Sequence, residues 1–236
     1  MSVGIRTLTL GRDVKGLLPA RLGIGAGIIA DSRADDEFDE YWLKARFLTG
    51  RDPGFELFET MLATPAGELP QLQRHLDRLA RSAVLLGFVF DADAACAVLL
   101  EAATASSDSP RRLRLALAHN GRLKLTQAPL QALNPGEVKL LIAPHRLSDD
   151  NPLAAHKTTL RRHCDAGVQA AELAGAFDSL FFSRSGWLVE GGRSSVFVRL
   201  DGRWWTPPLA DGALPGVMRG LLLEDRPGRR ASADSI

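Results

Sequence analysis

Hydrophobic and polar residues follow two different spacings along the chain, and each spacing predicts a different element. Residues 2–10 alternate between the two kinds, as a half-buried strand does, and residues 55–63 are also predicted to form a strand. From Pro70 to Gly87, apolar side chains recur every three or four residues, which predicts an amphipathic helix. We expect another helix at 158–174, with Gly175 as the residue that ends it.

Short strands joined by glycine turns dominate the second half of the chain. Apolar runs flank three dipeptides that favour tight turns, namely Asn120-Gly121, Ser185-Gly186 and Asp201-Gly202. A further strand is predicted at 137–143, and further helices at 92–105 and 218–224. Hairpins mixed with helices favour an α+β fold with mainly antiparallel sheet over a doubly wound fold.

A polar junction divides the chain. Residues 49–54 read Thr-Gly-Arg-Asp-Pro-Gly, and proline and glycine within a polar run are typical of a linker. We therefore predict a first segment at 1–50 and a main domain at 51–225. The chain turns polar again at 226–236, which is predicted to be a tail.

Composition narrows the classes of function. The 236 residues carry a formal net charge of +1 at pH 7, and 45% of them are hydrophobic. The chain can therefore bury a core, but its charge does not attract nucleic acid or an anionic membrane. No apolar run is long enough to span a membrane, no signal peptide follows Met1, and Cys96 and Cys164 form no metal or redox motif. We expect a cytoplasmic protein that acts on a small molecule, with no metal site and no membrane or nucleic-acid partner.

Lys157 is the first candidate for chemistry. It lies between the turn marked by Asn151-Pro152 and the predicted helix at 158–174, so the positive end of the helix dipole disfavours its protonated form. Arg161 and Arg162 lie one turn further on, and positive charge nearby lowers the pKa of a lysine amine. A lysine with a lowered pKa can act as a nucleophile. The alternative is a lysine on a basic surface.

Two other segments carry groups that complement such a lysine. Glu190 follows a predicted strand and precedes the polar loop 191–195, and residues 214–219 form a glycine-containing turn that enters a helix. Backbone amides at a helix N-terminus bind phosphate. A lysine amine, a carboxylate for a ring nitrogen and a phosphate-binding turn are together what pyridoxal phosphate requires. Taken singly, Glu190 is also explained as a surface charge, and 214–219 as an ordinary helix cap.

The first fifty residues contain a different candidate site. Residues 22–32 are rich in glycine, whose amides can approach an anion, and Glu37 and Glu40 share one face of the helix predicted to follow. Such a pair either holds Mg²⁺ or faces solvent. With Ile5-Arg-Thr7 and Lys44-Ala-Arg46, these residues resemble the C-terminus of chorismate-binding enzymes, such as component I of para-aminobenzoate synthase and of anthranilate synthase. The resemblance covers about the last eighth of such a domain, which implies a remnant without catalysis of its own.

Six motifs occur after Phe55 in a fixed order. They are Leu57-Phe-Glu-Thr-Met61, His75-Leu-Asp-Arg-Leu79 with Ser82-Ala83, His156-Lys-Thr158, Val189-Glu-Gly191 with Arg193-Ser-Ser-Val-Phe197, Thr206-Pro207 and Leu214-Pro-Gly-Val-Met-Arg219. Together they resemble the class IV pyridoxal-phosphate enzymes, which include branched-chain aminotransferases, D-amino-acid aminotransferases and aminodeoxychorismate lyases. The resemblance implies that family's fold, a small α/β domain and a larger one with mainly antiparallel sheet, and a homodimer.

The resemblance also implies a role for each site residue. Lys157 would hold the cofactor covalently and move protons, and Glu190 would pair with the pyridinium nitrogen. The residues implied for the rest of the cofactor, its phosphate above all, are Arg78, Ser194, Ser195, and the backbone amides of Val217 and Met218. No metal ligand is implied in this domain.

The two resemblances together imply a reaction. A chorismate-binding segment joined to such a domain resembles bifunctional para-aminobenzoate synthases, whose second domain is aminodeoxychorismate lyase. This implies conversion of 4-amino-4-deoxychorismate into 4-aminobenzoate and pyruvate, for folate biosynthesis. The alternative enzyme is a branched-chain or D-amino-acid aminotransferase. Members of the family continue for roughly fifty residues beyond the helix at 218–224, so we also expect a chain truncated at its C-terminus, and an inactive remnant is the third alternative.

Overall fold

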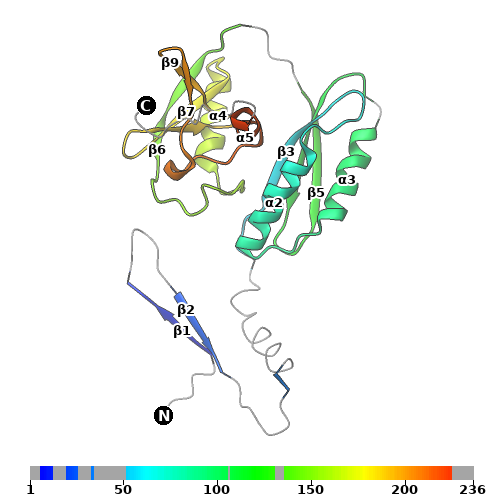
Figure 1. Ribbon diagram of the computed structural model, residues 1–236, viewed down its shortest axis with the longest axis vertical. Helices are drawn as coiled ribbons and strands as arrows, with labels where there is room; N and C mark the ends of the chain where they lie inside the picture. Colours follow the sequence, from blue (N-terminus) through cyan, green and yellow to red (C-terminus); the bar gives the residue numbers. More distant parts are fainter. Residues whose placement is uncertain are drawn as a thin grey trace. The chain divides into compact units, whose positions relative to one another are not determined.

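A computed structural model of the chain describes residues 6–12, 20–25, 33–34, 52–105, 107–130 and 136–224 (Figure 1). Its contacts divide the chain into two compact units, Met1–Gly54 and Phe55–Ile236. Within the described parts, no helix is long and apolar enough to cross a membrane.

The first unit contains a hairpin. β1 (Arg6–Leu10) and β2 (Ala20–Ile24) pair antiparallel, with Arg6 opposite Ile24 and Leu10 opposite Ala20. β1 confirms the predicted strand over residues 6–10. β2 is not among the predicted strands, and it includes residues 22–24 of the glycine-rich segment, which pair with β1. The rest of that segment, at 26–32, and the predicted helix with Glu37 and Glu40 lie outside the described residues.

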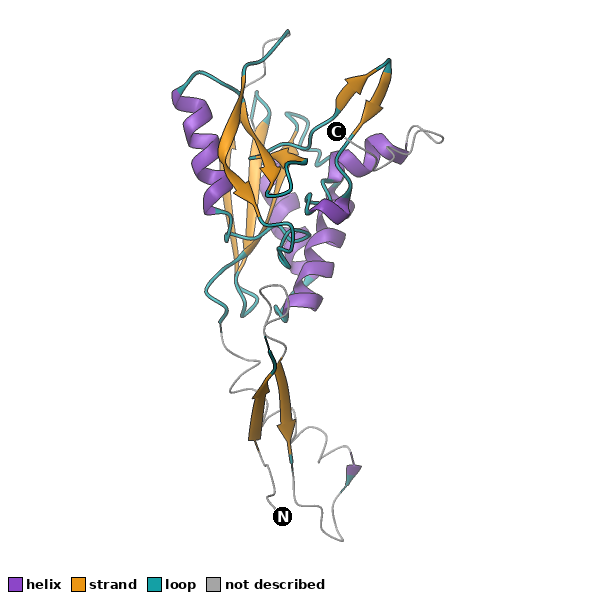
Figure 2. Ribbon diagram, turned by 90° about the vertical axis from the view of Figure 1, so that its left-hand side faces the viewer, coloured by secondary structure: helices purple, strands orange, loops and turns teal. Residues whose placement is uncertain are grey.

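The second unit begins with a three-stranded antiparallel sheet covered by two helices. β3 (Leu57–Ala63), β4 (Arg111–Leu117) and β5 (Leu123–Pro129) pair in that order. α2 (Leu72–Leu86) and α3 (Ala92–Thr104) pack against it, as Figures 1 and 2 show. Leucines at no more than 2% exposure line the contact: Leu57, Leu79, Leu99, Leu113, Leu115 and Leu117. Burying each such side chain stabilises the fold by about 1.5–3 kcal/mol. The core therefore holds β3, and the side chains that project from it, in a fixed position.

A second three-stranded sheet follows. β6 (Leu140–Leu147) and β7 (Asp178–Ser183) are parallel and are connected through α4 (Arg162–Leu173), while β8 (Leu188–Gly191) returns antiparallel beside β7. β9 (Val198–Leu200) and β10 (Arg203–Trp205) form a separate hairpin, and α5 (Val217–Glu224) comes last. The predicted α+β class with mainly antiparallel sheet is confirmed, and β6–β7 is the parallel exception among the described strands.

The segment around Lys157 differs from the prediction. A helix is expected from residue 158, but α4 begins at Arg162. Thr158 forms a bridge with Leu57, the amide of Phe58 donates to the carbonyl of Lys157 at 2.9 Å, and the amide of Glu56 donates to the Thr159 hydroxyl at 2.9 Å. β-Branched threonines favour this extended pairing over a helix. Lys157 therefore lies on an extended segment fixed to β3, five residues before α4.

Candidate active site

Lys157 lies in a partly buried, crowded position. Its Nζ is 4.8 Å from the centre of the Phe58 ring. Burial lowers the pKa of the amine to about 8, the positive charges of Arg161 and Arg78 add to the effect, and the carboxylates of Glu59 and Glu190 oppose it. The charge expected from Arg161 is therefore present. A sizeable share of this amine is neutral at physiological pH, which is not so for an ordinary lysine.

Glu190 comes from β8 and is engaged rather than free at the surface. Its Oε2 accepts a hydrogen bond from the amide of Leu214 at 3.0 Å. Burial raises the pKa of Glu190, while the Leu214 bond and the charges of Arg161 and Lys157 lower it, and the Asp178 carboxylate raises it further. The amine of Lys157 and this carboxylate are thus close enough to influence each other's protonation.

Arg78 of α2 is buried, at 6% exposure, and most of its guanidinium is already occupied. Its Nε and Nη2 donate to the Glu59 carboxylate at 2.7 and 2.6 Å, and its Nη1 donates to the Pro215 carbonyl at 2.9 Å. His75 Nδ1 lies 2.7 Å from the same carboxylate. An arginine has five N–H donors, so two of those of Arg78 remain for another acceptor.

Burial alone would raise the pKa of Glu59, but the hydrogen bonds with His75 and Arg78 and the charge of Arg78 outweigh burial and hold that pKa below its usual value. The group is therefore an ionised carboxylate shared by a histidine and an arginine. Neither Glu59 nor its bonding to Arg78 is expected from the sequence alone. The available signal is an acidic residue between buried apolar positions of β3, together with His75 and Arg78 one turn apart on α2.

The turn before α5 leaves backbone donors available. Gly216 lies so close to Ser195 that a Cβ at this position would be 2.4 Å from the Ser195 hydroxyl oxygen. Val217 and Met218 begin α5, and their amides donate no hydrogen bond to any described residue. Unpaired amides at a helix start favour an anion. Ser195 thus lies next to the turn that leads into the amides of Val217 and Met218.

Ser194, also predicted to contact the cofactor, lies in a different environment from Ser195. Its hydroxyl donates to the Asp178 carboxylate at 2.6 Å, and its carbonyl accepts from the amide of Gly191 at 2.9 Å. Asp178 is fully buried and also accepts from the amides of Ser179 and Arg193 at 2.8 and 3.1 Å. Ser194 therefore holds the loop after β8 in shape, whereas Ser195 is the serine beside the α5 turn.

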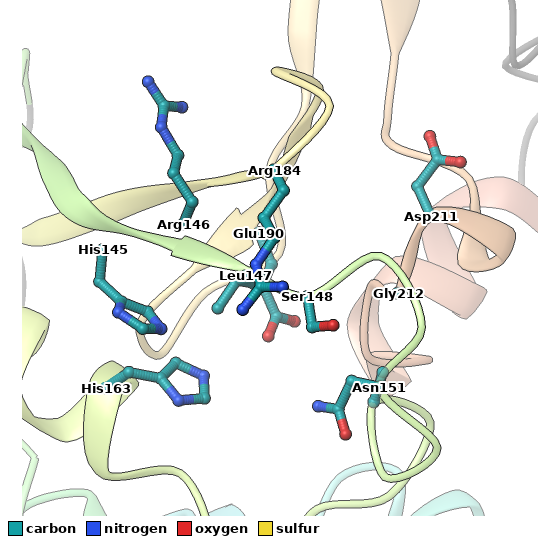
Figure 3. Close-up of a pocket in the computed structure, with 11 residues that line it drawn as sticks. His145, Arg146, Leu147, Ser148, Asn151, His163, Arg184, Glu190, Asp211 and Gly212 are labelled. Carbon is teal, nitrogen blue, oxygen red and sulfur yellow. The ribbon is translucent and has the colours of Figure 1, made fainter. Parts of the chain in front are cut away.

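A pocket of about 210 Å³ is lined in part by Glu190 (Figure 3). The rings of His145 and His163 stack at 5.3 Å on one side of it, and Asn151 lies on the other. The pocket shares Glu190 with the group described above, but its lining does not include Lys157 or Arg78. Within the described ranges, no three His, Cys, Asp or Glu side chains gather as metal ligands would.

Comparison with known proteins divides the sequence in two. Residues 56–227 match the family described as "Amino-transferase class IV", and residues 1–50 match the family described as "chorismate binding enzyme". A Schizosaccharomyces pombe protein named "Putative aminodeoxychorismate lyase" is 31% identical over 172 residues, which are 72% of this chain and 73% of that protein.

Solved structures show the same similarity. A protein from Mesorhizobium loti, described as a "Putative amino-acid aminotransferase", is 36% identical with a TM-score of 0.67, over 72% of this chain and 83% of that one. The 4-amino-4-deoxychorismate lyase from Pseudomonas aeruginosa is 28% identical with a TM-score of 0.61, over 72% and 68% of the two chains.

Proposed function

The chain belongs to the class IV aminotransferase family, and from this premise we propose that it is a pyridoxal-phosphate-dependent lyase that converts 4-amino-4-deoxychorismate into 4-aminobenzoate and pyruvate for folate biosynthesis. The observation that carries the proposal is a lysine amine with a pKa of about 8, Lys157, within electrostatic range of the Glu190 carboxylate. The similarity to the S. pombe and P. aeruginosa proteins and the chorismate-binding match at 1–50 support the lyase over other reactions of the family.

The residues present fit pyridoxal phosphate. Lys157 would hold it covalently through its amine, and Glu190 would face its ring nitrogen. Gly216, where a Cβ would collide with Ser195, lets the turn before α5 approach Ser195, and the amides of Val217 and Met218 would bind the phosphate group. Arg78 would add its two remaining N–H groups to that anion.

Each residue then has a chemical task. Bound pyridoxal phosphate withdraws electrons from a substrate carbon next to the amine nitrogen. Lys157 is poised to take the ring proton from that carbon, because its lowered pKa lets the amine be neutral near pH 8. The bond from the substrate ring to the enolpyruvyl oxygen breaks, pyruvate leaves with a proton, and the ring becomes aromatic. Glu190, as an anion, stabilises a proton on the ring nitrogen and so sustains the electron withdrawal.

The proposal also assigns a role to each segment of the chain. We propose residues 51–225 as the catalytic domain, acting as a homodimer, with residues 1–50 as a chorismate-binding remnant that takes no part in the reaction and residues 226–236 as a tail. A cytoplasmic location is supported by the cysteines, since Cys96 and Cys164 are both free.

The test is to supply purified protein with pyridoxal phosphate and 4-amino-4-deoxychorismate and to measure 4-aminobenzoate and pyruvate. Equal amounts of the two products are expected, and Lys157→Ala should form neither. Borohydride reduction should fix the cofactor on Lys157, as located by mass spectrometry, whereas Lys124→Ala should behave as the unchanged protein. Failure to attach the cofactor would contradict the proposal at its first step.

An amino-acid aminotransferase is the second candidate, and the 36% identity with the M. loti protein favours it. The two activities are separated by a panel of branched-chain and D-amino acids with 2-oxoglutarate. If the amino acids yield glutamate and the lyase substrate yields no 4-aminobenzoate, the chain is an aminotransferase and not a lyase.

A further inference from the structure

Three cationic side chains surround one aromatic ring in the site. The guanidinium carbon of Arg114 is 4.3 Å from the centre of the Phe58 ring, Lys157 Nζ is 4.8 Å from it, and the guanidinium carbon of Arg161 is 5.9 Å from it. Arg114 lies nearest the ring, where its charge gains a cation–π interaction. Arg161 lies furthest from the ring centre, at the limit of the distance over which a cation–π interaction is significant.

Arg161 makes no hydrogen bond to a carboxylate among the described residues. Its Nη2 donates to the Gly192 carbonyl, a neutral group, while its Nε is buried and makes no hydrogen bond to any described residue. That Nε is 3.4 Å from the Asp165 carboxylate, too poorly placed for a hydrogen bond, and the Asp165 side chain is 68% exposed. A pair that water reaches this easily contributes little.

The groups near Arg161 do not provide an acceptor for its Nε, although the Glu190 carboxylate is near enough for the charge of Arg161 to lower its pKa. Burial raises the pKa of the neighbouring Cys164 thiol to about 11, so the thiol stays neutral. Glu59 is bound by Arg78 and His75, and Glu190 by the amide of Leu214. A buried donor without an acceptor costs free energy, which an incoming acceptor recovers.

We propose that Arg161 binds a carboxylate group of the amine substrate beside Lys157. The inference rests on the proposed function, since it takes the substrate to be an amine that carries a carboxylate. An arginine fork matches the two oxygens of a carboxylate, and the bond is strongest where water is excluded.

The contact has a consequence for the lysine. Four charged groups influence the pKa of Lys157 from the elements packed around it: Glu59 of β3, Arg78 of α2, Glu190 of β8, and Arg161 before α4. Arg114 of β4 contacts the same Phe58 ring as Lys157. After burial, Arg161 is the largest influence that lowers the pKa of Lys157. A carboxylate on Arg161 offsets that positive charge, so the pKa of Lys157 rises. In the chain without cofactor, Lys157 is therefore a readily neutral amine when Arg161 binds no anion, and a stronger base when Arg161 binds a carboxylate.

The experiment uses the full chain without cofactor, with benzoate as the carboxylate probe and benzyl alcohol as its neutral counterpart. Lys157 is acetylated with uncharged acetic anhydride over a range of pH, and its modified fraction is followed by mass spectrometry, with Lys124 and Lys139 as references. Benzoate should shift the midpoint of Lys157 modification to higher pH, and benzyl alcohol should not. Equal midpoints with the two probes would overturn the proposal without the need for any variant.

Arg161→Gln and Arg162→Gln form a matched pair of neighbouring arginines, of which Arg162 is exposed. Without any probe, Arg161→Gln should raise the pH midpoint of Lys157 modification, because a positive charge is removed. The variant should bind benzoate roughly tenfold more weakly or worse, and benzoate should not shift its midpoint further. Arg162→Gln should behave as the unchanged chain. If Arg161→Gln does not fold, Arg161→Lys keeps the charge and should lose benzoate affinity alone. Benzoate shifting Arg161→Gln as it shifts the unchanged chain would contradict the role of Arg161.

These readouts require neither cofactor nor turnover, so the two proposals fail separately. If the chain shows the benzoate shift but makes no 4-aminobenzoate, the carboxylate site is supported and the lyase assignment is wrong. If the chain makes 4-aminobenzoate but shows no benzoate shift, the lyase assignment is supported and the role proposed for Arg161 is wrong.

Discussion

Glu59 and Arg78 form a two-point ion pair inside the second unit, with Nε and Nη2 of Arg78 donating to the two carboxylate oxygens at 2.7 and 2.6 Å. Glu59 is 1% exposed, so nothing but the protein solvates it. The pair joins β3 to α2, and Pro215 extends it to the turn before α5. The arginine assigned by resemblance to the phosphate is thus held in place by the protein before any ligand binds.

Glu59→Gln should destabilise the fold, because it leaves Arg78 as a buried charge without its counter-ion. Breaking one partner of a buried pair typically costs about 3–5 kcal/mol. The free energy of unfolding, from urea titration, measures the loss. Glu224→Gln is the control, since Glu224 pairs with Arg74 at 2.5 Å on the exposed side of the same helix, and it should change stability little. Equal effects of the two changes would show that the buried ion pair contributes no more to stability than the exposed one.

Gly216→Ala should weaken cofactor binding, because its Cβ would lie 2.4 Å from the Ser195 hydroxyl oxygen and force the turn before α5 to shift. Gly220 lies within α5, four residues further on, and a Cβ at this position would have nothing within 4 Å, so Gly220→Ala is the matched control. The dissociation constant of pyridoxal phosphate, from absorbance titration, should rise for Gly216→Ala and stay unchanged for Gly220→Ala. Unaltered cofactor affinity in both variants would show that the turn before α5 does not bind the phosphate.

Glu190→Gln should slow turnover by roughly a hundredfold or more, because the amide cannot stabilise a proton on the ring nitrogen. The amide oxygen still accepts from the Leu214 amide, so the fold should survive. The turnover number for 4-aminobenzoate formation measures the effect. Glu172→Gln, which removes a carboxylate 2.8 Å from Arg193, is the control. A Glu190→Gln protein with unchanged turnover would exclude the assigned role.

Lys157 should make stability depend on pH in a defined window. The pKa of its amine is about 8 in the folded chain and is ordinary in the unfolded chain, so the unfolded state binds the extra proton between these values. Stability therefore rises with pH from about 8 up to the ordinary lysine value, and below pH 8 the full penalty for charging the buried amine is present. Lys157→Met removes the amine.

The free energy of unfolding of both proteins should be compared at several pH values in that window. Lys157→Met should be favoured most at pH 7, and its advantage should shrink toward pH 10. A difference that does not vary with pH would mean that Lys157 titrates alike in the folded and unfolded chains.

Local patterns predict the elements whose causes are local. The Pro70–Gly87 periodicity matches α2 at 72–86, with Gly87 in the left-handed conformation at φ 74°, and Asn120-Gly121 closes the β4–β5 hairpin with Gly121 at φ 89°. Both depend on side chains within a few positions. The prediction of a class IV fold succeeds for a related reason, since its motifs are short.

Contacts between distant parts of the chain account for what the sequence does not reveal. The strand predicted at 137–143 lies instead at 140–147, because β7 pairs alongside it in parallel. Thr158 and Thr159 are extended because Glu56 and Leu57 bind them. The fixed orientation of Arg78 depends on Glu59, and no periodicity reports a pair of this kind.

The attachment of Lys157 to β3 also determines when the site can exist during folding. The Glu56 amide and the Thr159 hydroxyl that help position the lysine are 103 residues apart in sequence, and contacts of such long range form only after a large loop has closed. Residues of β3, α2, α3 and β4 share one hydrophobic core, so we expect the early half of this unit to assemble before Lys157 is aligned. A chain caught part-way through folding would therefore carry the lysine but not the lowered pKa, and its reactivity would report completed assembly.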